Sequence, residues 1–294
     1  MEIGYYGIAE ECLILESDRQ DLLPNRNKFL LSEKEAALFS SEKCFRIVCR
    51  MKTEGNKEEG NTAKSSTEKE LLHTDFLTVF RREDGYRLVY REANTTVVCL
   101  LRKKEPYATV LYDGNVGEPS RCAVRDAFFF YLQQKGKAVL HSASFVYKNK
   151  ACLFSAASGG GKSTQVRLWH EQNYPITDLN GDLAACFVNA EGIATAAGIP
   201  WCGTSEITSN AVVPIGAIVF LQKGETNEVT ELKQPEKTMR LLARLVTPVW
   251  EEALADLNFH VAQEVAERVL AERLTCCLQN EAATIMKKNF DNFF

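Results

Sequence analysis

The sequence predicts a mixed α/β (α+β) protein with two parts: an antiparallel β-rich N-terminal domain over residues 1–118 and an α/β domain over residues 119–294. Three observations predict this division. Short β-rich runs separated by turn signals fill residues 43–113, a helical pattern covers residues 121–136, and strand-like and helix-like segments alternate beyond it. A chain of 294 residues is also long enough for two domains.

The N-terminal domain is predicted from its β-rich runs. These runs are residues 44–51, 75–82, 86–92, 96–103 and 107–113. The turn residues Glu83-Asp84-Gly85 and Glu92-Ala93-Asn94 are hairpin signals, so we expect an antiparallel meander. Residues 52–70 interrupt the pattern with mixed charge, Gly, Asn and Ser, and we expect a mobile hairpin loop there.

The second domain begins with the helical segment 121–136, in which apolar residues recur at helical spacing up to Gly136. Strands are expected at residues 139–147, 151–155, 183–188, 193–197, 215–221 and 229–232. Helices are expected after residue 161 through Trp169, and over residues 236–246 and 251–272. The final segment predicts a short strand and then an amphipathic helix that places Ala282, Ile285 and Met286 on one face.

Composition excludes several classes of protein. Lys+Arg number 35 against 39 Asp+Glu, and this net charge of −4 lacks the positive excess of nucleic-acid binders. The longest apolar stretch, residues 211–221, is too short to span a bilayer and contains Pro214. The ten cysteines include no C-x-x-C pair, so we expect reduced thiols. We therefore expect a cytoplasmic protein with no nucleic-acid or membrane partner; a homo-oligomer is compatible with the sequence.

The sharpest motif is the segment Ala156-Ala157-Ser158-Gly159-Gly160-Gly161-Lys162-Ser163. It fits the phosphate-loop pattern G-x-x-x-x-G-K-[ST], except that Ala156 stands in place of the first glycine. An apolar strand precedes it and helix-forming sequence follows, which is the setting the motif requires. The alternative is a flexible glycine loop that happens to precede Lys-Ser.

The chemistry of this motif is phosphate binding. Successive glycines let backbone N–H groups turn inward, and a helix N-terminus adds partial positive charge. We expect a nucleotide to bind Ser158, Gly159, Gly160, Gly161, Lys162, Ser163 and Thr164. Lys162 would contact the β- and γ-phosphates, and the Ser163 hydroxyl would ligate Mg²⁺.

Phosphoryl transfer also needs a carboxylate, and Asp178 and Asp182 are the candidates. Asp182 directly precedes the apolar run 183–188, which predicts a position at a strand terminus beside the loop. Both could instead be turn-forming residues around Asn180-Gly181. Three helical arginines could neutralise phosphate charge or could simply be solvated: Arg167, Arg240 and Arg244.

His141 lies in the strand before the loop strand and could orient a carboxylate or a phosphate, or could be structural. With it, the segments LHSASFVYKNKACLFSAASGGGKST, ITDLNGD, GIPWCG and IGAIVFL resemble the catalytic domain of HPr kinase/phosphorylase. The resemblance covers residues 123–290. It implies a core similar to that of phosphoenolpyruvate carboxykinase, in which a phosphate loop joins a histidine and an aspartate.

By this resemblance, His141, Lys162, Ser163 and Asp182 fall on functional positions of the family, with Asp178 as a further acid. The family's Asp-Asp pair is Gly181-Asp182 here, so Asp182 serves alone or with Asp178. The resemblance implies ATP and Mg²⁺ as cofactors, with Ser163 and Asp182 as metal ligands.

Together these features predict an ATP-dependent phosphotransferase that phosphorylates a serine or threonine hydroxyl of a small protein or peptide. The N-terminal domain would help to recognise this acceptor. Two alternatives stay open: a non-catalytic ATP-binding sensor, and a carboxykinase-like enzyme acting on a small metabolite.

Overall fold

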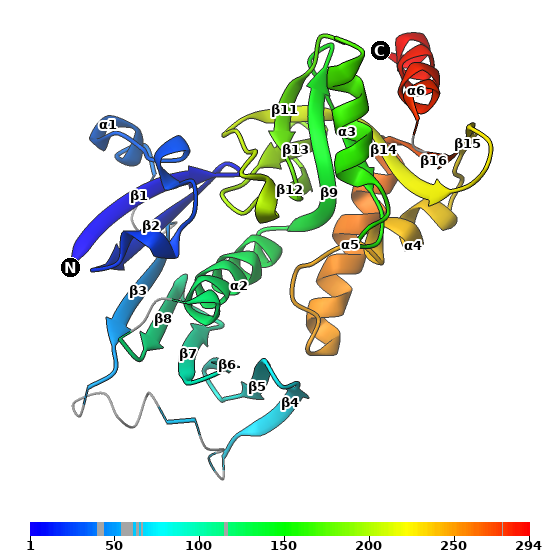
Figure 1. The fold of residues 1–294 in the computed structure, drawn as a ribbon. Helices are drawn as coiled ribbons and strands as arrows, with labels where there is room; N and C mark the ends of the chain where they lie inside the picture. The colour runs from blue at the N-terminus through cyan, green and yellow to red at the C-terminus, as the bar shows by residue number, and fades with distance from the viewer. Residues whose placement is uncertain (40–43, 54–60, 63–64, 66, 115–116, 278) are drawn as a thin grey trace. The chain divides into compact units, whose positions relative to one another are not determined.

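The computed structural model describes residues 1–39, 44–53, 61–62, 65, 67–114, 117–277 and 279–294. Its contacts divide the chain into two compact units (Figure 1). Unit 1 comprises Met1–Gln134 and Pro248–Ala255, and unit 2 comprises Lys135–Thr247 and Asp256–Phe294. The sequence predicted a boundary after residue 118, whereas the structure divides the chain at residue 134. The reason is that the helix following residue 117 packs on the N-terminal sheet.

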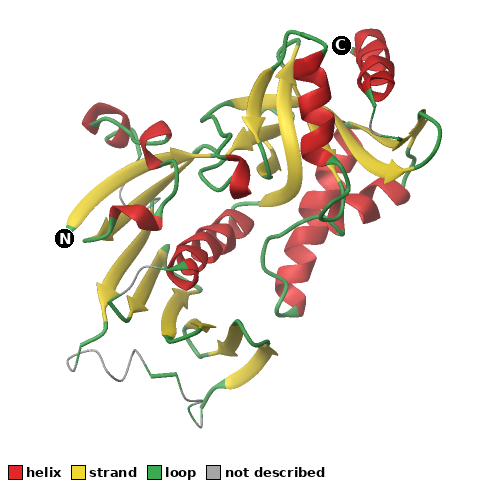
Figure 2. Cartoon of the chain, viewed as in Figure 1, coloured by secondary structure: helices red, strands yellow, loops and turns green. Residues whose placement is uncertain are grey.

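Unit 1 is built on one eight-stranded sheet of order β1-β2-β3-β8-β7-β6-β5-β4. In chain order its strands are β1 (Glu2–Ile8), β2 (Glu11–Ser17), β3 (Phe45–Met51), β4 (Lys69–His73), β5 (Leu77–Arg81), β6 (Gly85–Glu92), β7 (Thr95–Arg102) and β8 (Tyr107–Tyr112). Its helices are α1 (Glu33–Ala36) and α2 (Glu118–Gln134). Figure 2 shows both helix and strand assignments along the chain.

The predicted antiparallel meander holds for β5 to β8 but not for β3, and β4 was not predicted. Adjacent strands from β4 to β8 pair antiparallel through short turns, whereas β3 is parallel to both β2 and β8. Parallel neighbours cannot be joined by a tight hairpin, and β3 is reached from both partners through long connections. The predicted mobile loop at 52–70 lies largely outside the described residues, and Lys69 and Glu70 belong to β4.

Helix α2 covers this sheet with an apolar face. Its buried residues include Ala123, Ala127 and Phe128, and the ring of Tyr131 stacks on Phe45 of β3 at 4.7 Å. The Gln133 amide donates hydrogen bonds to the carbonyls of Pro248 (2.8 Å) and Leu254 (2.9 Å). These bonds attach the returning segment 248–255 to unit 1.

Unit 2 is built on mixed strands whose order is β10-β9-β12-β13-β14-β16-β15, with β11 paired to β9 and β10 also paired to β14. The strands are β9 (Lys137–Tyr147), β10 (Lys150–Ser155), β11 (Thr177–Asn180), β12 (Leu183–Val188), β13 (Ala194–Gly198), β14 (Val212–Lys223), β15 (Glu228–Glu231) and β16 (Leu270–Cys276). The helices are α3 (Lys162–Glu171), α4 (Glu236–Leu242), α5 (Glu252–Arg268), which begins in unit 1, and α6 (Asn280–Phe293).

Two apolar clusters cover opposite faces of β10 and β14, because side chains alternate along a strand. Leu153 and Ile218 pack with residues of α4 and α5, such as Leu241 and Val265. Phe154 and Val219 pack with residues of α3 and α6 in the second cluster, which includes Trp169 and Phe290. The strand before the loop is therefore buried on both sides, which fixes where the loop begins.

The predicted strands of unit 2 are present with shifts of one to three residues at their ends, apart from β16. The helix predicted over residues 251–272 ends at Arg268, and the apolar residues after it open β16, which lies parallel to β14. A short apolar run fits a helix or a buried strand equally well, and here pairing with β14 makes these residues a strand. In the described part of the chain, no helix has the length and hydropathy needed to cross a membrane.

A buried ion pair lies within the N-terminal sheet. The Arg87 guanidinium of β6 donates to both carboxylate oxygens of Glu68, with Nε at 2.8 Å, and lies 4.4 Å from the ring centre of Phe80. The two side chains are only 5% and 7% exposed. Burial opposes ionisation of Glu68, but the hydrogen bonds from Arg87 and from the Ser65 N–H, together with the charges of Arg87 and Arg82, outweigh burial, and the pKa of Glu68 is lowered.

Replacing Arg87 should therefore destabilise unit 1 strongly, because Glu68 would be left as a buried charge without its partner. We expect Arg87→Met to cost about 3–5 kcal/mol of unfolding free energy. The exposed Arg102→Met should change it by less than about 0.5 kcal/mol. Hydrogen exchange of the β6 amides under native conditions measures both. Equal effects of the two substitutions would show that the pair does not hold the sheet.

Candidate functional site

The predicted phosphate loop, residues 156–163, lies between the carboxyl end of β10 and the first turn of α3. Gly161, at the N-terminus of α3, has a φ of 95°, a left-handed conformation that disfavours a side chain. Ser158, Gly159 and Ser163 are exposed, and Thr164 is half-buried in the first turn. The loop therefore offers backbone N–H groups and a hydroxyl at a helix N-terminus, a setting suited to an anion.

The structure also explains the departure from the motif at Ala156. A Cβ on Gly160 would lie 2.6 Å from the Ala156 Cβ and 2.9 Å from the Ala157 carbonyl oxygen. The methyl group of Ala156 therefore fits because position 160 carries no side chain. The alanine is compatible with a tight loop.

Lys162 is buried, with 8% of its surface exposed. Burial lowers the pKa of its ammonium group; Asp182 acts in the opposite direction, and Arg244 lowers the pKa further. These electrostatic effects place Asp182 and Arg244 near the Lys162 ammonium. A buried cation of this kind is suited to bind a polyanion, which would replace the water it has lost.

His141 and Asp182 form a direct pair beside this lysine. The imidazole Nε2 lies 3.0 Å from Oδ1 of Asp182, and the Ser142 N–H donates to the Asp182 carbonyl at 2.9 Å. Antiparallel pairing of β9 with β12 sets His141 opposite Leu183, the residue after Asp182. The two side chains are 28% and 34% exposed, so both can be reached from solvent.

Of the three arginines, only Arg244 is brought to the site. Its carbonyl accepts a hydrogen bond from the His141 N–H at 3.0 Å, and its charge acts on Lys162. Arg167 and Arg240 instead form exposed i,i+4 pairs with glutamates of their own helices. Both behave as the solvated helical arginines that the sequence left as an alternative.

The structure does not bring Asp178 to this site. Its Oδ1 lies 2.9 Å from Nε2 of His170 in the last turn of α3, about 12 Å along the helix from Lys162. In the sheet Asp178 is opposite Phe145, four residues beyond His141. Asp178 therefore lies apart from the His141–Asp182 pair.

Gly181 cannot carry a second acid without rearrangement. A Cβ at this position would lie 2.0 Å from Oγ of Ser205 and 2.6 Å from its Cβ. Ser205 is itself held, because its hydroxyl donates to the Cys202 carbonyl at 2.7 Å. Gly181 is thus matched to the segment packed over it.

Two residues of the site were not found by sequence reasoning. Asn180 read as half of an Asn-Gly turn, yet it is fully buried and hydrogen-bonded to several groups. Gly203, with φ 60°, lies where a Cβ would be 3.0 Å from Oδ2 of Asp182. Neither contact has a signal in the sequence, because each joins segments that only the fold brings together. Trp201 is buried.

The residues of the site could offer a magnesium ion only a few oxygen ligands. Ser163 and Asp182 supply hard oxygen ligands, and the described residues contain no group of three or more His, Cys, Asp or Glu that could hold a metal by themselves. This composition suits a cation that takes most of its ligands from nucleotide phosphates and water, as Mg²⁺ does.

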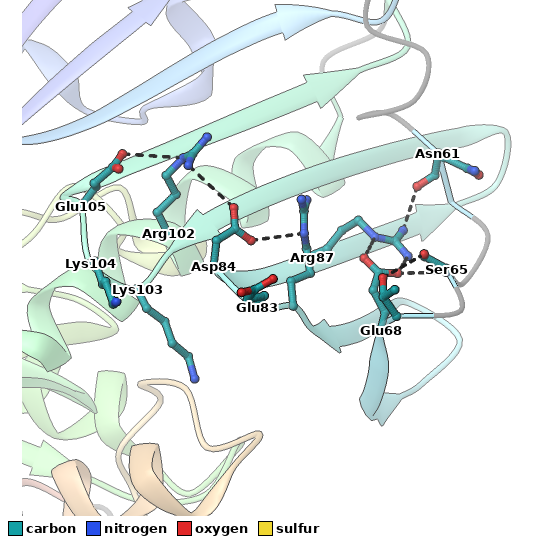
Figure 3. A pocket seen from close by; sticks show the side chains of 12 residues that line it. Asn61, Ser65, Glu68, Glu83, Asp84, Arg87, Arg102, Lys103, Lys104 and Glu105 are labelled. Carbon is teal, nitrogen blue, oxygen red and sulfur yellow. Dashed lines mark hydrogen bonds and ion pairs between the residues drawn. The ribbon is translucent and has the colours of Figure 1, made fainter.

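Unit 1 has a separate pocket of about 1160 Å³ (Figure 3). It is lined by Asn61, Ser65, Thr67, Glu68, Arg82, Glu83, Asp84, Arg87, Arg102, Lys103, Lys104 and Glu105. Many of its charges pair with one another: Asp84 lies 3.4 Å from Arg82 and 3.7 Å from Arg102.

The close fit at Gly181 yields a prediction. Gly181→Ala should destabilise unit 2 by about 1–3 kcal/mol, because its Cβ overlaps Ser205. Ser205→Gly should recover most of this loss in the double variant. A double-mutant cycle of unfolding free energies measures the coupling. Strictly additive effects would show that the two residues do not meet.

Comparison with known proteins identifies no family. No family model matches the chain, and no curated protein is similar to it in sequence. Among solved structures, it is similar to the HPr(Ser) kinase/phosphatase from Coxiella burnetii, with a TM-score of 0.30 and 9% identity over 52% of this chain and 95% of that chain. A likeness of this size assigns neither a family nor an activity, so the resemblance to HPr kinase stays a prediction from the motifs.

Proposed function

We propose that this protein is an ATP-dependent kinase that transfers the γ-phosphoryl group to a serine or threonine hydroxyl of a small protein or peptide. One observation carries the proposal: a buried lysine at a phosphate loop lies near a histidine–aspartate pair at 3.0 Å. Phosphate binding and proton acceptance are the two tasks that phosphoryl transfer demands of a protein.

In this proposal the loop amides and Lys162 bind the β- and γ-phosphates. The acceptor oxygen forms a bond to the γ-phosphorus as the bond to the β,γ-bridging oxygen breaks, and ADP leaves with that electron pair. The acceptor proton passes to the Asp182 carboxylate, which His141 orients. Lys162 and Arg244 stabilise the charge that builds up on the phosphate oxygens.

Ser163 and Asp182 would hold Mg²⁺, which neutralises phosphate charge when bound. The N-terminal unit would help to recognise the acceptor; this stays a prediction.

One alternative retains support from a specific observation. The single carboxylate beside Gly181 also suits a nucleotide sensor without transfer activity. Nothing in the site favours a carboxykinase-like enzyme, since Arg244 is the one arginine of the three candidates near the loop. The test below separates the kinase from the sensor.

Transfer of labelled γ-phosphate from Mg-ATP into a size-fractionated extract of the source cells tests the proposal. We expect an acid-stable label on a small protein or peptide. Lys162→Ala should lower it about 100-fold or more, because the lysine acts on charge that develops during transfer. The exposed Lys233→Ala is the control. ATP binding with no label in any fraction would favour the sensor, and full activity of Lys162→Ala would refute the kinase assignment.

The lowered pKa of Lys162 predicts how nucleotide affinity depends on pH. The ammonium form binds phosphate, so ADP affinity should fall as pH rises through a pKa below the ordinary lysine value of 10.5. Because bound phosphate raises that pKa, binding at alkaline pH should take up a proton. Calorimetry in buffers of different ionisation enthalpy measures both effects. Lys162→Arg should remove the alkaline loss; the same loss in that variant would assign it to another group.

A further inference from the structure

Asn180 lies at the end of β11 and is fully buried. Its Oδ1 accepts hydrogen bonds from the N–H groups of Asp182 and Leu183, both at 2.9 Å. Its Nδ2 donates toward the carbonyls of Ile199 (2.8 Å) and Trp201 (3.2 Å). The partners fix the orientation of the amide, since two donors face one end and two carbonyl acceptors face the other.

The segment that Nδ2 contacts, residues 199–208, is the one packed over Asp182. Nδ2 also lies 3.2 Å from Oγ1 of Thr208, which donates to the Ile199 carbonyl at 2.7 Å. From this segment Gly203 approaches the Asp182 carboxylate, and Ser205 fills the space beside Gly181. One side chain thus connects the backbone of Asp182 with the segment that bounds its carboxylate.

We propose that Asn180 is the positioning residue of this site, which holds the Asp182 carboxylate at a fixed place relative to the phosphate loop by hydrogen-bonding both to Asp182 and to residues 199–208. The inference rests on the proposed function, because it concerns an acid that acts on a bound nucleotide. Asn180 itself does not touch the nucleotide.

Only an amide performs this task at position 180. An aspartate keeps the acceptor oxygen but loses both donors, and it would face the carbonyls of Ile199 and Trp201 as a buried charge. The segment 199–208 would then separate from Asp182. Binding of nucleotide alone depends on the loop and Lys162, and it should persist.

The test uses the full chain and measures ATP affinity by calorimetry with EDTA and with Mg²⁺. In the wild type, Mg²⁺ should strengthen binding through Ser163 and Asp182. Asn180→Asp should reduce this Mg²⁺-dependent gain roughly 10- to 100-fold, as expected for a residue that orients a metal ligand. Asp182→Asn should remove the same gain, and Asn180→Asp should keep the affinity in EDTA within about twofold of the wild-type value.

The matched control is Asn258→Asp. Asn258 is also buried and bonds Thr247 through both ends of its amide. It should lose stability but keep the Mg²⁺-dependent gain. Gly203→Ala is a second route: Gly203 is exposed, and its added Cβ would press on Oδ2 of Asp182. It should lower the gain even if Asn180→Asp fails to fold.

The outcomes are distinguishable. A wild type that binds no ATP would overturn the proposed function. If the wild type gains affinity from Mg²⁺ and Asn180→Asp retains this gain, the positioning role is overturned and the proposed function stands. If Asn180→Asp does not fold, the same conclusion follows from a gain retained in Gly203→Ala. Loss of the gain in Asn258→Asp as well would assign the effect to general destabilisation.

Discussion

The candidate site depends on the pairing of one long strand, β9. Its first half pairs with β12 and its second half with β10 and β11, so that a single strand joins the strand before the phosphate loop to the strand after Asp182. His141 lies near the change of partner, and the Ser155 hydroxyl donates to its carbonyl at 2.8 Å. The positions of the histidine, the acid and the loop therefore follow from backbone hydrogen bonds between strands, to which the side chain of Asn180 adds its bonds to the Asp182 backbone.

This arrangement matters because the positive charges at the site are only partly balanced by negative charge. Lys162 is buried near another cation, Arg244, and only Asp182 acts to stabilise its charge. A polyphosphate would supply the missing negative charge, so the empty protein is prepared for an anionic ligand. The same arrangement explains why one carboxylate can suffice: its partner His141 and the loop amides already surround the region where phosphate charge would develop.

Gly181, the residue before Asp182, is closely packed against the segment 199–208. A Cβ at Gly181 would meet Ser205, and a Cβ at Gly203 would meet the Asp182 carboxylate. Asn180 hydrogen-bonds both to the Asp182 backbone and to the carbonyl of Trp201 in this segment. The site therefore combines one carboxylate, Asp182, with the closely packed segment 199–208 beside it.

Sequence alone determined the local features. The meander from β5 to β8 and the glycine loop with its flanking strand and helix could be predicted, because hydrophobic period, turn residues and motif spacing act over a few residues. The grouping of Lys162, His141 and Asp182 was predicted from the resemblance to HPr kinase. The tertiary structure decided the parallel placement of β3, the end of α5 at Arg268, the remoteness of Asp178, and the burial of Asn180 and its contact with residues 199–208. These features depend on contacts between segments far apart in the chain, and no local pattern of residues specifies which distant strand or loop will be the partner.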